Sequence, residues 1–350
     1  SAPGLSARIV GSDLIYQQHR INQVNADILW QQARADARMN ISEFSLPGLH
    51  GNSLSMSIIG EPGQHDIQIM LDANELQLNA SAKGNWQAPV WQGQVEQLTI
   101  SQPDFGSWVN AKPVILQASK DRFIVEHACF TRESTSLCSA IQLQETDTQI
   151  TANLKDLPLK ELLQPLNVDA EIEGNINGGL KLQGPLNALR GQADFKLEQG
   201  LVTVSAADEP LSLVLREGLA DLQITPSNLN AELRLKAGDA SIHASATTGP
   251  LKAGMNAHLK GSLKAEIPQI SQISLLVPGL TQVDGRLALL ADLKGTLDKP
   301  EVQGFLELEN ASATVPQLGL SLQKAHLIAK NHGTDRVTFE GDVTSGSGKL

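Results

Sequence analysis

The sequence predicts an all-β protein whose sheet has one apolar face and one polar face. Three observations lead to this fold class: apolar residues recur at every second position, glycine and proline interrupt the alternating runs, and aromatic residues make up only 3% of the chain. Alternation places successive side chains on opposite faces of a strand. Such a sheet has to cover its apolar face, and with so few aromatic rings that surface is aliphatic.

The alternation is clearest between Val283 and Leu322. Leucines fall at every second position, while Arg286, Glu307 and Glu309 face the other way, with Leu290 as the clear exception. Leucine favours helices, but glycine and proline interrupt this stretch too often for helices of useful length. The residues expected on the apolar face are Leu287, Leu289, Leu293, Leu306, Leu308, Leu318, Leu320 and Leu322.

Residues 1–155 are predicted to form a first series of strands. Alternating runs such as Asp66 to Leu71 are separated by polar turns, which we expect at 60–63, at 84–85 and at 103–104. The stretch from Ile28 to Arg38 has helical character in isolation, but the asparagines around it and the alternation on either side favour strand.

Two short helices are expected, at 156–167 and at 267–280. In the first, Asp156 would cap the helix, leucines recur three and four residues apart, and Pro165 ends it. In the second, isoleucines and Val277 form one stripe before a Pro-Gly stop. The helices would divide the chain into an N-terminal β-segment (1–155), a middle β-repeat (168–266) and a C-terminal β-repeat (281–350).

The two β-repeats begin alike, with Val-Asp at Val168 and at Val283. The distance from each valine to an expected turn glycine is 16 residues to Gly184 and 12 residues to Gly295. The difference is even, so every later side chain keeps its face, as a one-sided sheet requires. The repeat of about 110 residues is much longer than the roughly 20 to 30 residues of a β-solenoid, so a solenoid adhesin or lyase is the least favoured class.

The charge of the chain argues against a nucleic-acid partner. The net charge is -11, and no cationic cluster is present that would bind a phosphate backbone. The longest nearly apolar run, Ile273 to Leu280, is far shorter than the roughly 20 residues that span a bilayer. The sequence opens without a secretion signal and closes within strand-like text, so we expect a piece of a longer protein.

No motif for catalysis or metal binding is found. The eight histidines are scattered, without His-Glu-x-x-His or Cys-x-x-Cys spacing. The segment 345–348 lacks the strand-to-helix context of a nucleophile elbow, and 177–179 is not followed by the helix of a phosphate-binding loop, so both are expected to be turns or bulges. We therefore expect no enzyme activity, no metal and no cofactor.

Cys129 and Cys138 flank eight residues that contain a polar turn, which suggests a β-hairpin. Cysteines on opposing strands can meet the geometry of a disulfide, and closing so short a loop would stabilise the fold by about 3 kcal/mol. Two reduced, half-buried cysteines fit the same pattern.

The order of these features along the chain resembles the repeated core of the TamB family. The resemblance covers nearly the whole chain and rests on Gly295 to Leu308 (GTLDKPEVQGFLEL), Leu318 to Leu322 (LGLSL), the closing GDVTSGSGKL, Trp91 to Ile100 (WQGQVEQLTI), the cysteine pair, Leu157-Pro158-Leu159 and the two Val-Asp starts.

The resemblance implies a fold, a location and partners. TamB-like chains form an elongated, lengthwise-folded open β-sheet groove, apolar inside and polar outside. They are periplasmic, are tethered to the inner membrane through an N-terminal anchor that this sequence lacks, and work with the outer-membrane barrel subunit of the translocation and assembly module. The oxidising periplasm favours a disulfide between Cys129 and Cys138.

By this resemblance, the chain is expected to be a non-enzymatic conduit whose groove carries phospholipid acyl chains. Leu180 and Leu182 would line the groove together with the eight leucines of the apolar face named above. The alternative is a scaffold that guides outer-membrane proteins, because exposed sheet edges can accept a client strand. At about ten to twelve residues per strand and turn, the chain would make about 30 strands in a sheet on the order of 140 Å long.

Overall fold

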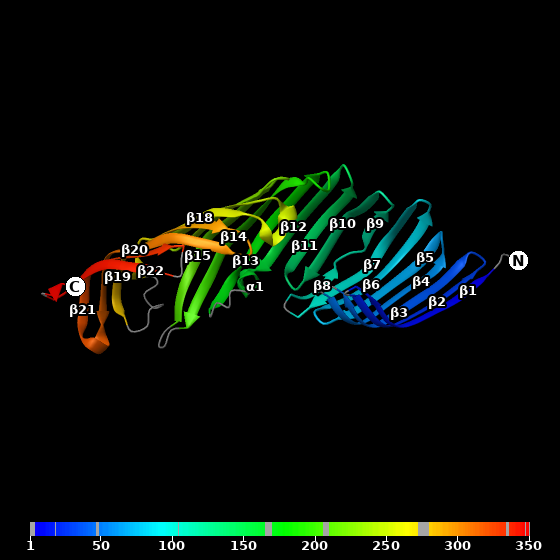
Figure 1. Cartoon of the computed structure of the whole chain (residues 1–350), viewed down its shortest axis with the longest axis horizontal. Helices are drawn as coiled ribbons and strands as arrows, with labels where there is room; N and C mark the ends of the chain where they lie inside the picture. The colour runs from blue at the N-terminus through cyan, green and yellow to red at the C-terminus, as the bar shows by residue number, and fades with distance from the viewer. Residues whose placement is uncertain are drawn as a thin grey trace. The chain divides into compact units, whose positions relative to one another are not determined.

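The computed structural model describes residues 4–17, 19–46, 49–103, 105–164, 170–205, 210–271, 280–333, 336–346 and 348–349. It is a nearly pure antiparallel β-protein (Figure 1), which confirms the predicted all-β fold class. The chain forms two compact units: unit 1 comprises Ser1–Leu154 with Gln183–Leu186, and unit 2 comprises Lys155–Leu182 with Asn187–Leu350. The expected domain boundaries within unit 2 stay predictions.

Unit 1 is a meander in which neighbouring strands of the sequence pair with one another. From β1 to β7 each strand pairs with the next, β7 pairs with both β8 and β9, and β10 pairs with these two and with β11. The strands are β1 (Leu5–Tyr16), β2 (His19–Gln31), β3 (Arg34–Leu46), β4 (Leu49–Glu61), β5 (Gln64–Ala73), β6 (Leu76–Gln87), β7 (Val90–Gln102), β8 (Gly106–Asn110), β9 (Val114–Ala118), β10 (Arg122–Arg132) and β11 (Thr135–Gln144), and β12 (Thr148–Pro158) begins in this unit.

Unit 2 continues the same antiparallel pattern. From β14 to β23 each strand pairs with the next. Its strands are β13 (Glu171–Gly184), β14 (Arg190–Ser205), β15 (Pro210–Ile224), β16 (Leu229–Ala237), β17 (Ala240–Thr248), β18 (Leu259–Ile267), β19 (Thr281–Gly295), β20 (Pro300–Val315), β21 (Leu320–His332), β22 (Val337–Ser345) and β23 (Gly348–Lys349), and its helices are α1 (Leu159–Leu163) and the 3-10 helices η2 (Leu251–Asn256) and η4 (Pro316–Leu318).

The strands are longer than the sequence pattern suggested. β2, β3, β4 and β7 have 13 residues each, and β14 and β20 have 16. A strand and turn of ten to twelve residues, and hence about 30 strands, was therefore wrong; the strands of the described residues end at β23. At Asn310 of β20, for example, a bulge lets the strand bend and continue.

In unit 1 the strand pairing is interrupted at the same level on neighbouring strands. Asp13 of β1 and Glu43 of β3 have positive φ angles of 51° and 47°, and the pairing skips Asn22 of β2 and Asn52 of β4 beside them. The Asn22 Nδ2 donates a hydrogen bond of 2.7 Å to Glu43, so polar side chains at these interruptions pair with each other. The register itself shifts beside Asn52, in the pairing of β4 with β5, and a bulge there bends the strand.

Unit 2 has a line of bulges that crosses three neighbouring strands. Gln282 of β19, Asn310 of β20 and Lys324 of β21 all have positive φ angles, and the register shifts beside each of them. Each unit thus carries a crease that crosses its strands, which is the local feature that bending a sheet along its length requires.

The predicted helices need correction. Asp156 does not cap a helix: it lies in β12, where its N–H donates to the Asn177 side chain over 3.1 Å, and α1 begins only at Leu159 with Pro158 as its cap. The second expected helix, 267–280, falls mostly on 272–279, outside the described residues, and Ile267 is the last residue of β18. Among the described residues, no helix is long and apolar enough to cross a membrane.

The expected turns are partly confirmed. Gly184 and Gly295 end β13 and β19 with φ angles of 115° and 92°, as turn glycines do. The turn expected at Gly84 is wrong, because Gly84 lies inside β6. Glycine is needed there for another reason: a Cβ would lie 2.3 Å from the Trp91 ring, which covers this backbone.

Candidate functional site: the apolar sheet faces

The strands of unit 2 place two of the predicted leucines, Leu289 and Leu306, in one apolar row. Leu289 of β19 lies opposite Ala265 of β18 and Leu306 of β20, and Leu306 in turn lies opposite Ala329 of β21. From β14 to β22 this row consists of Leu197, Gly218, Leu235, Ile242, Ala265, Leu289, Leu306, Ala329 and Phe339. We call the sheet face that carries this row the apolar face of unit 2.

Asp292 lies three residues after Leu289 on β19, so the row of paired residues that contains Asp292 belongs to the opposite face of the sheet. Every member of that row is polar. It consists of Asp194, Asp221, Glu232, Ser245, Ser262, Asp292 and Gln303. We call this the polar face of unit 2. Arg286 and Glu309 form an ion pair of 3.1 Å there, and Glu307 lies 3.1 Å from His326.

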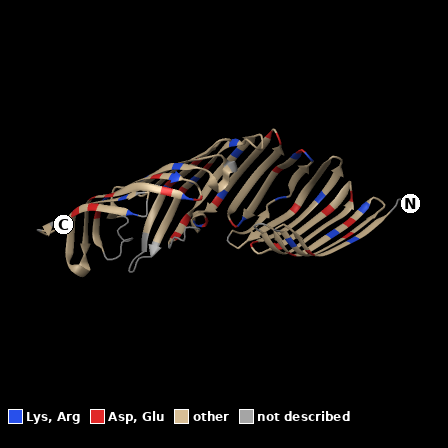
Figure 2. Ribbon diagram, viewed as in Figure 1, with Lys and Arg blue, Asp and Glu red and all other residues tan. Residues whose placement is uncertain are grey.

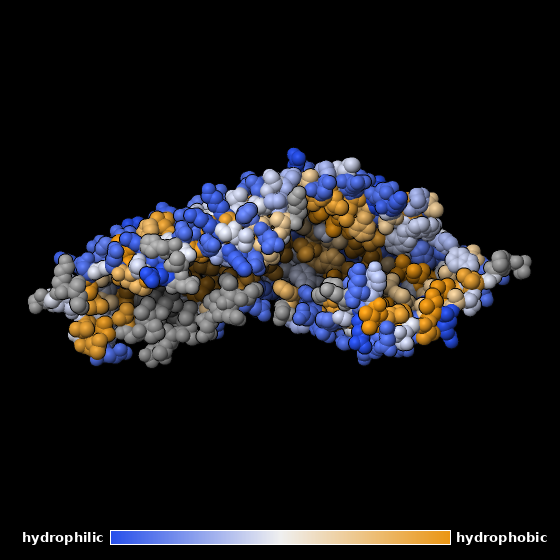
Figure 3. Space-filling model, viewed as in Figure 1, coloured by the Kyte–Doolittle hydropathy of each residue, from blue (hydrophilic) through white to orange (hydrophobic). Residues whose placement is uncertain are grey.

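Unit 1 is built in the same way. Its apolar face carries a row formed by Ile28, Ala37, Ile58, Ile67, Ala82, Val95 and Val114. Its polar face carries a row formed by Arg8, Asp27, Arg38, Ser57, Gln68, Ser81 and Gln97. In the view of Figure 3, hydrophobic surface lines a hollow in this unit and hydrophilic residues frame it.

The sequence analysis named no groove-lining residue in unit 1. The signal was present, because Asp66 to Leu71 alternates strictly. Ile67, Ile69 and Leu71 are half-buried, and Asp66, Gln68 and Met70 are exposed. The sequence does not show the register of strand pairing, and only the register shows that these residues continue a row across several strands.

Half of the predicted groove residues lie on the apolar face of unit 2 and remain half-buried. This holds for Leu287, Leu289, Leu293, Leu306 and Leu308. Leu180 and Leu182 of β13 are also half-buried and alternate with the exposed Lys181. Aliphatic side chains that stay half-exposed along successive strands form a surface that can gain stability when hydrocarbon covers it.

The end of the predicted series differs. Leu318 lies in η4 and is 70% exposed, so the strand expected from Leu318 begins only at Leu320. Pro316 and the left-handed Gly319 explain the interruption, since they start and stop a single helical turn. Leu320 and Leu322 then pair with Val315 and Ala313 of β20.

Helix α1 covers one part of the apolar face of unit 2. Leu159 is only 9% exposed and belongs to a buried cluster with Ile176, Leu197, Leu215 and Ala237. Leu197 is also the first member of the apolar row described above. The helix therefore packs on the apolar face of unit 2.

The cysteines lie away from the apolar face of unit 1. Cys129 of β10 is directly opposite Cys138 of β11, and their sulfur atoms are bonded at 2.12 Å. The neighbours of Cys129, Ala128 and Phe130, belong to a hydrophobic cluster on the other face with Val114. The disulfide thus joins two strands on the polar face.

The charged side chains are spread over both units. Figure 2 shows acidic and basic residues interspersed along many strands. On the polar face of unit 2, the Lys264 ammonium lies 2.9 Å from the Glu266 carboxylate. The hydrogen bond from Lys264 and then its charge lower the pKa of Glu266.

The family described as TamB, N-terminal domain, matches residues 1–308 of the chain. No curated protein and no solved structure matches it.

Proposed function

From the membership of this chain in the TamB family, we propose that it is a non-enzymatic periplasmic conduit whose apolar faces carry phospholipid acyl chains between the inner and the outer membrane. In this proposal the full-length protein is tethered to the inner membrane by its N-terminal region. Its partner at the other side is the outer-membrane barrel subunit of the translocation and assembly module.

One observation carries the proposal: the apolar row from Leu197 to Phe339 continues through nine paired strands without a polar side chain. An acyl chain is flexible and aliphatic, so it can lie along such a row without specific hydrogen bonds. Each square ångström of apolar surface that it covers contributes about 25 cal/mol. A row that continues from strand to strand offers the chain many equivalent positions, as transport requires.

The test uses two neighbouring leucines on opposite faces. A photocrosslinking amino acid at Leu289 should capture phospholipid, detected by mass spectrometry, because Leu289 lies in the apolar row. The matched position is Leu290, which lies opposite Phe305 on the other face and should give little or no lipid adduct. Equal labelling at the two positions, or labelling of Leu290 alone, would overturn the conduit.

The second candidate is a scaffold for outer-membrane proteins, and β1 favours it. Among the described residues β1 pairs with β2 alone, and Ile9 and Ile15 on it are more than half exposed. Such an edge can accept an extended client strand through backbone hydrogen bonds. Binding of unfolded outer-membrane strands to lipid-free protein, with no lipid adduct at Leu289, would favour the scaffold over the conduit.

A further inference from the structure

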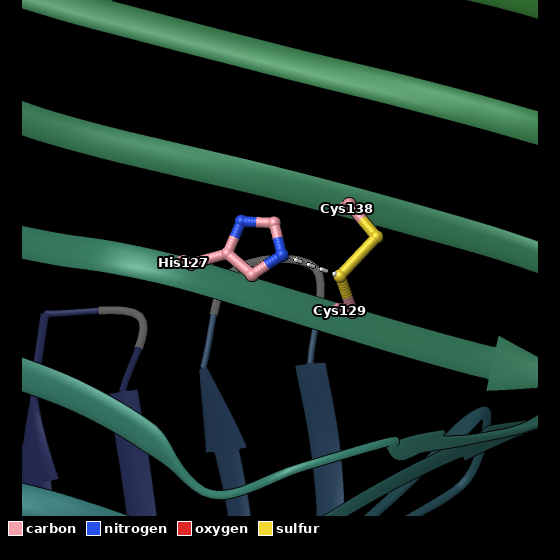
Figure 4. The surroundings of a disulfide bond; sticks show 3 residues. All are labelled: His127, Cys129 and Cys138. Atoms are coloured by element: carbon pink, nitrogen blue, oxygen red, sulfur yellow. Dashed lines mark hydrogen bonds between the residues drawn. A yellow bond between two sulfur atoms is a disulfide. The ribbon is translucent and has the colours of Figure 1, made fainter.

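A histidine and both cysteines converge on the polar face of unit 1. Figure 4 shows the His127 ring beside the disulfide, and its Nε2 lies 3.1 Å from the Sγ of Cys129. One ring nitrogen and the two sulfur atoms all lie within 4.8 Å of one another. These are the side-chain types that bind zinc in proteins.

The fold, and not a sequence motif, produces this arrangement. Cys138 reaches Cys129 because the two residues are direct partners of β11 and β10. A bulge in β10 between Val125 and Ala128 keeps both of these residues buried and leaves Glu126 and His127 exposed. His127 then lies two residues before Cys129, on the solvent side of the strand.

We propose that the reduced form of this hairpin binds one Zn²⁺ through His127, Cys129 and Cys138. A tetrahedral zinc ion takes sulfur ligands at about 2.3 Å and a histidine nitrogen at about 2.0 Å, which places the two sulfurs about 3.8 Å apart. The cysteine Cα atoms are 4.0 Å apart, so side-chain rotation after cleavage of the disulfide can supply this separation. Because His127 is exposed, water can occupy the fourth position.

The disulfide is converted to a zinc site in two steps, reduction and metal binding. A dithiol reductant gives two electrons and two protons to the disulfide, which becomes two thiols, while the reductant becomes a disulfide. Binding of Zn²⁺ then displaces both thiol protons, since the thiolate is the zinc ligand. The site lies on the polar face, so it is independent of lipid binding to the apolar face.

Zinc titration of the full chain tests the site. After reduction with a water-soluble phosphine, which takes up the oxygen of water as it cleaves the disulfide, the chain should bind one equivalent of Zn²⁺ in competition with a chromogenic chelator. The disulfide form should bind none at this site. Absence of stoichiometric binding by the reduced chain would overturn the proposal.

Variants separate the ligands. His127→Ala should weaken zinc binding by about tenfold or more, because loss of even an indirect partner of a zinc ligand costs about 10- to 100-fold. Glu126→Ala, at the other exposed residue of the bulge, should bind as wild type does, with unchanged far-ultraviolet circular dichroism. Wild-type affinity in His127→Ala would reduce the site to a dithiol pair and refute the three-ligand assignment.

X-ray absorption spectroscopy of the reduced, zinc-loaded wild-type chain identifies the zinc ligands without depending on the folding of a variant. Two sulfur scatterers together with imidazole are expected around the metal. A zinc shell with sulfur but no imidazole, or with oxygen alone, would contradict the assignment.

Discussion

Leu289 on β19 lies directly opposite Leu306 on β20, whereas the next residue, Leu290, lies opposite Phe305 on the other face of the same two strands. Two identical, adjacent side chains thus occupy opposite environments, one within a continuous apolar row and one that is 40% exposed among charged residues. Equal substitutions at these two residues therefore distinguish an effect on the apolar face from an effect on the general stability of the sheet.

Leu289→Arg should remove bound lipid and impair transport. A charge beside hydrocarbon costs several kcal/mol when it is unpaired, so an acyl chain would avoid the altered strand. The sheet itself should fold, because the long arginine stem can carry its charge towards water. Copurified phospholipid, measured by mass spectrometry of an organic extract, reports the loss. Leu306→Arg, on the partner strand, should act in the same way.

The matched control for this change is Leu290→Arg. It introduces the same charge at the adjacent residue, on the polar face, and should leave lipid content and complementation near wild type. A control at Glu309 is less clean, because arginine there would face Arg286. Retention of lipid by Leu289→Arg at the level of Leu290→Arg would contradict a transport path along the apolar row.

The disulfide should leave no free thiol in protein from an oxidising compartment. Cys129 and Cys138 are the two cysteines of the chain, and they are bonded to each other. Thiol labelling of the unfolded, unreduced protein should therefore modify neither residue, and prior reduction should expose both. Labelling of both cysteines without reduction would show that the bond does not form. Loss of the bond in Cys129→Ser should lower the free energy of unfolding by about 3 kcal/mol on the chain-entropy account.

Leu159→Ala in α1 should destabilise unit 2. The side chain is almost fully buried against Leu197 and Leu215, and removing a buried leucine side chain costs about 2–5 kcal/mol. Leu162 of the same helix is 53% exposed, so Leu162→Ala should change stability by no more than about 0.5 kcal/mol. Denaturant unfolding of the two variants checks the difference. Equal effects would mean that α1 is not docked on the apolar face.

Lys264→Met should raise the pKa of Glu266 towards its ordinary value. In the folded chain Lys264 lowers this pKa through its hydrogen bond and its charge. The contribution of the pair to folding is therefore present above the unfolded-state pKa of about 4.3 and is lost as the pH falls through the lower folded-state pKa. Carboxyl NMR titration measures the change. Lys260→Met, at another exposed lysine of β18, should leave the pKa of Glu266 where it is, and an equal shift in both variants would contradict the pairing.

Much of the fold follows from local spacing in the sequence. The face on which Leu289, Leu306 or Glu309 lies depends only on a period of two residues, so alternation predicted it correctly without knowledge of any partner strand. Ile28 to Arg38 was predicted as strand for the same reason, but the stretch contains a turn at Gln32 and Ala33, between β2 and β3, that was not expected. Short-range signals also gave the turns at Gly184 and Gly295 and the existence of α1.

Only the tertiary structure decided which residues meet across strands. The rows that join Leu197 to Phe339, or Ile28 to Val114, depend on the register of each pair, and bulges at residues such as Gln282 and Asn310 shift that register with no composition signal that marks them. Gly84 was misjudged as a turn because its role is to admit the Trp91 ring, and His127 was overlooked because it meets Cys129 and Cys138 only once β10 and β11 pair. Local alternation fixes a side chain's face, but contacts between distant segments depend on backbone pairing over the whole strand, which no short stretch of sequence contains.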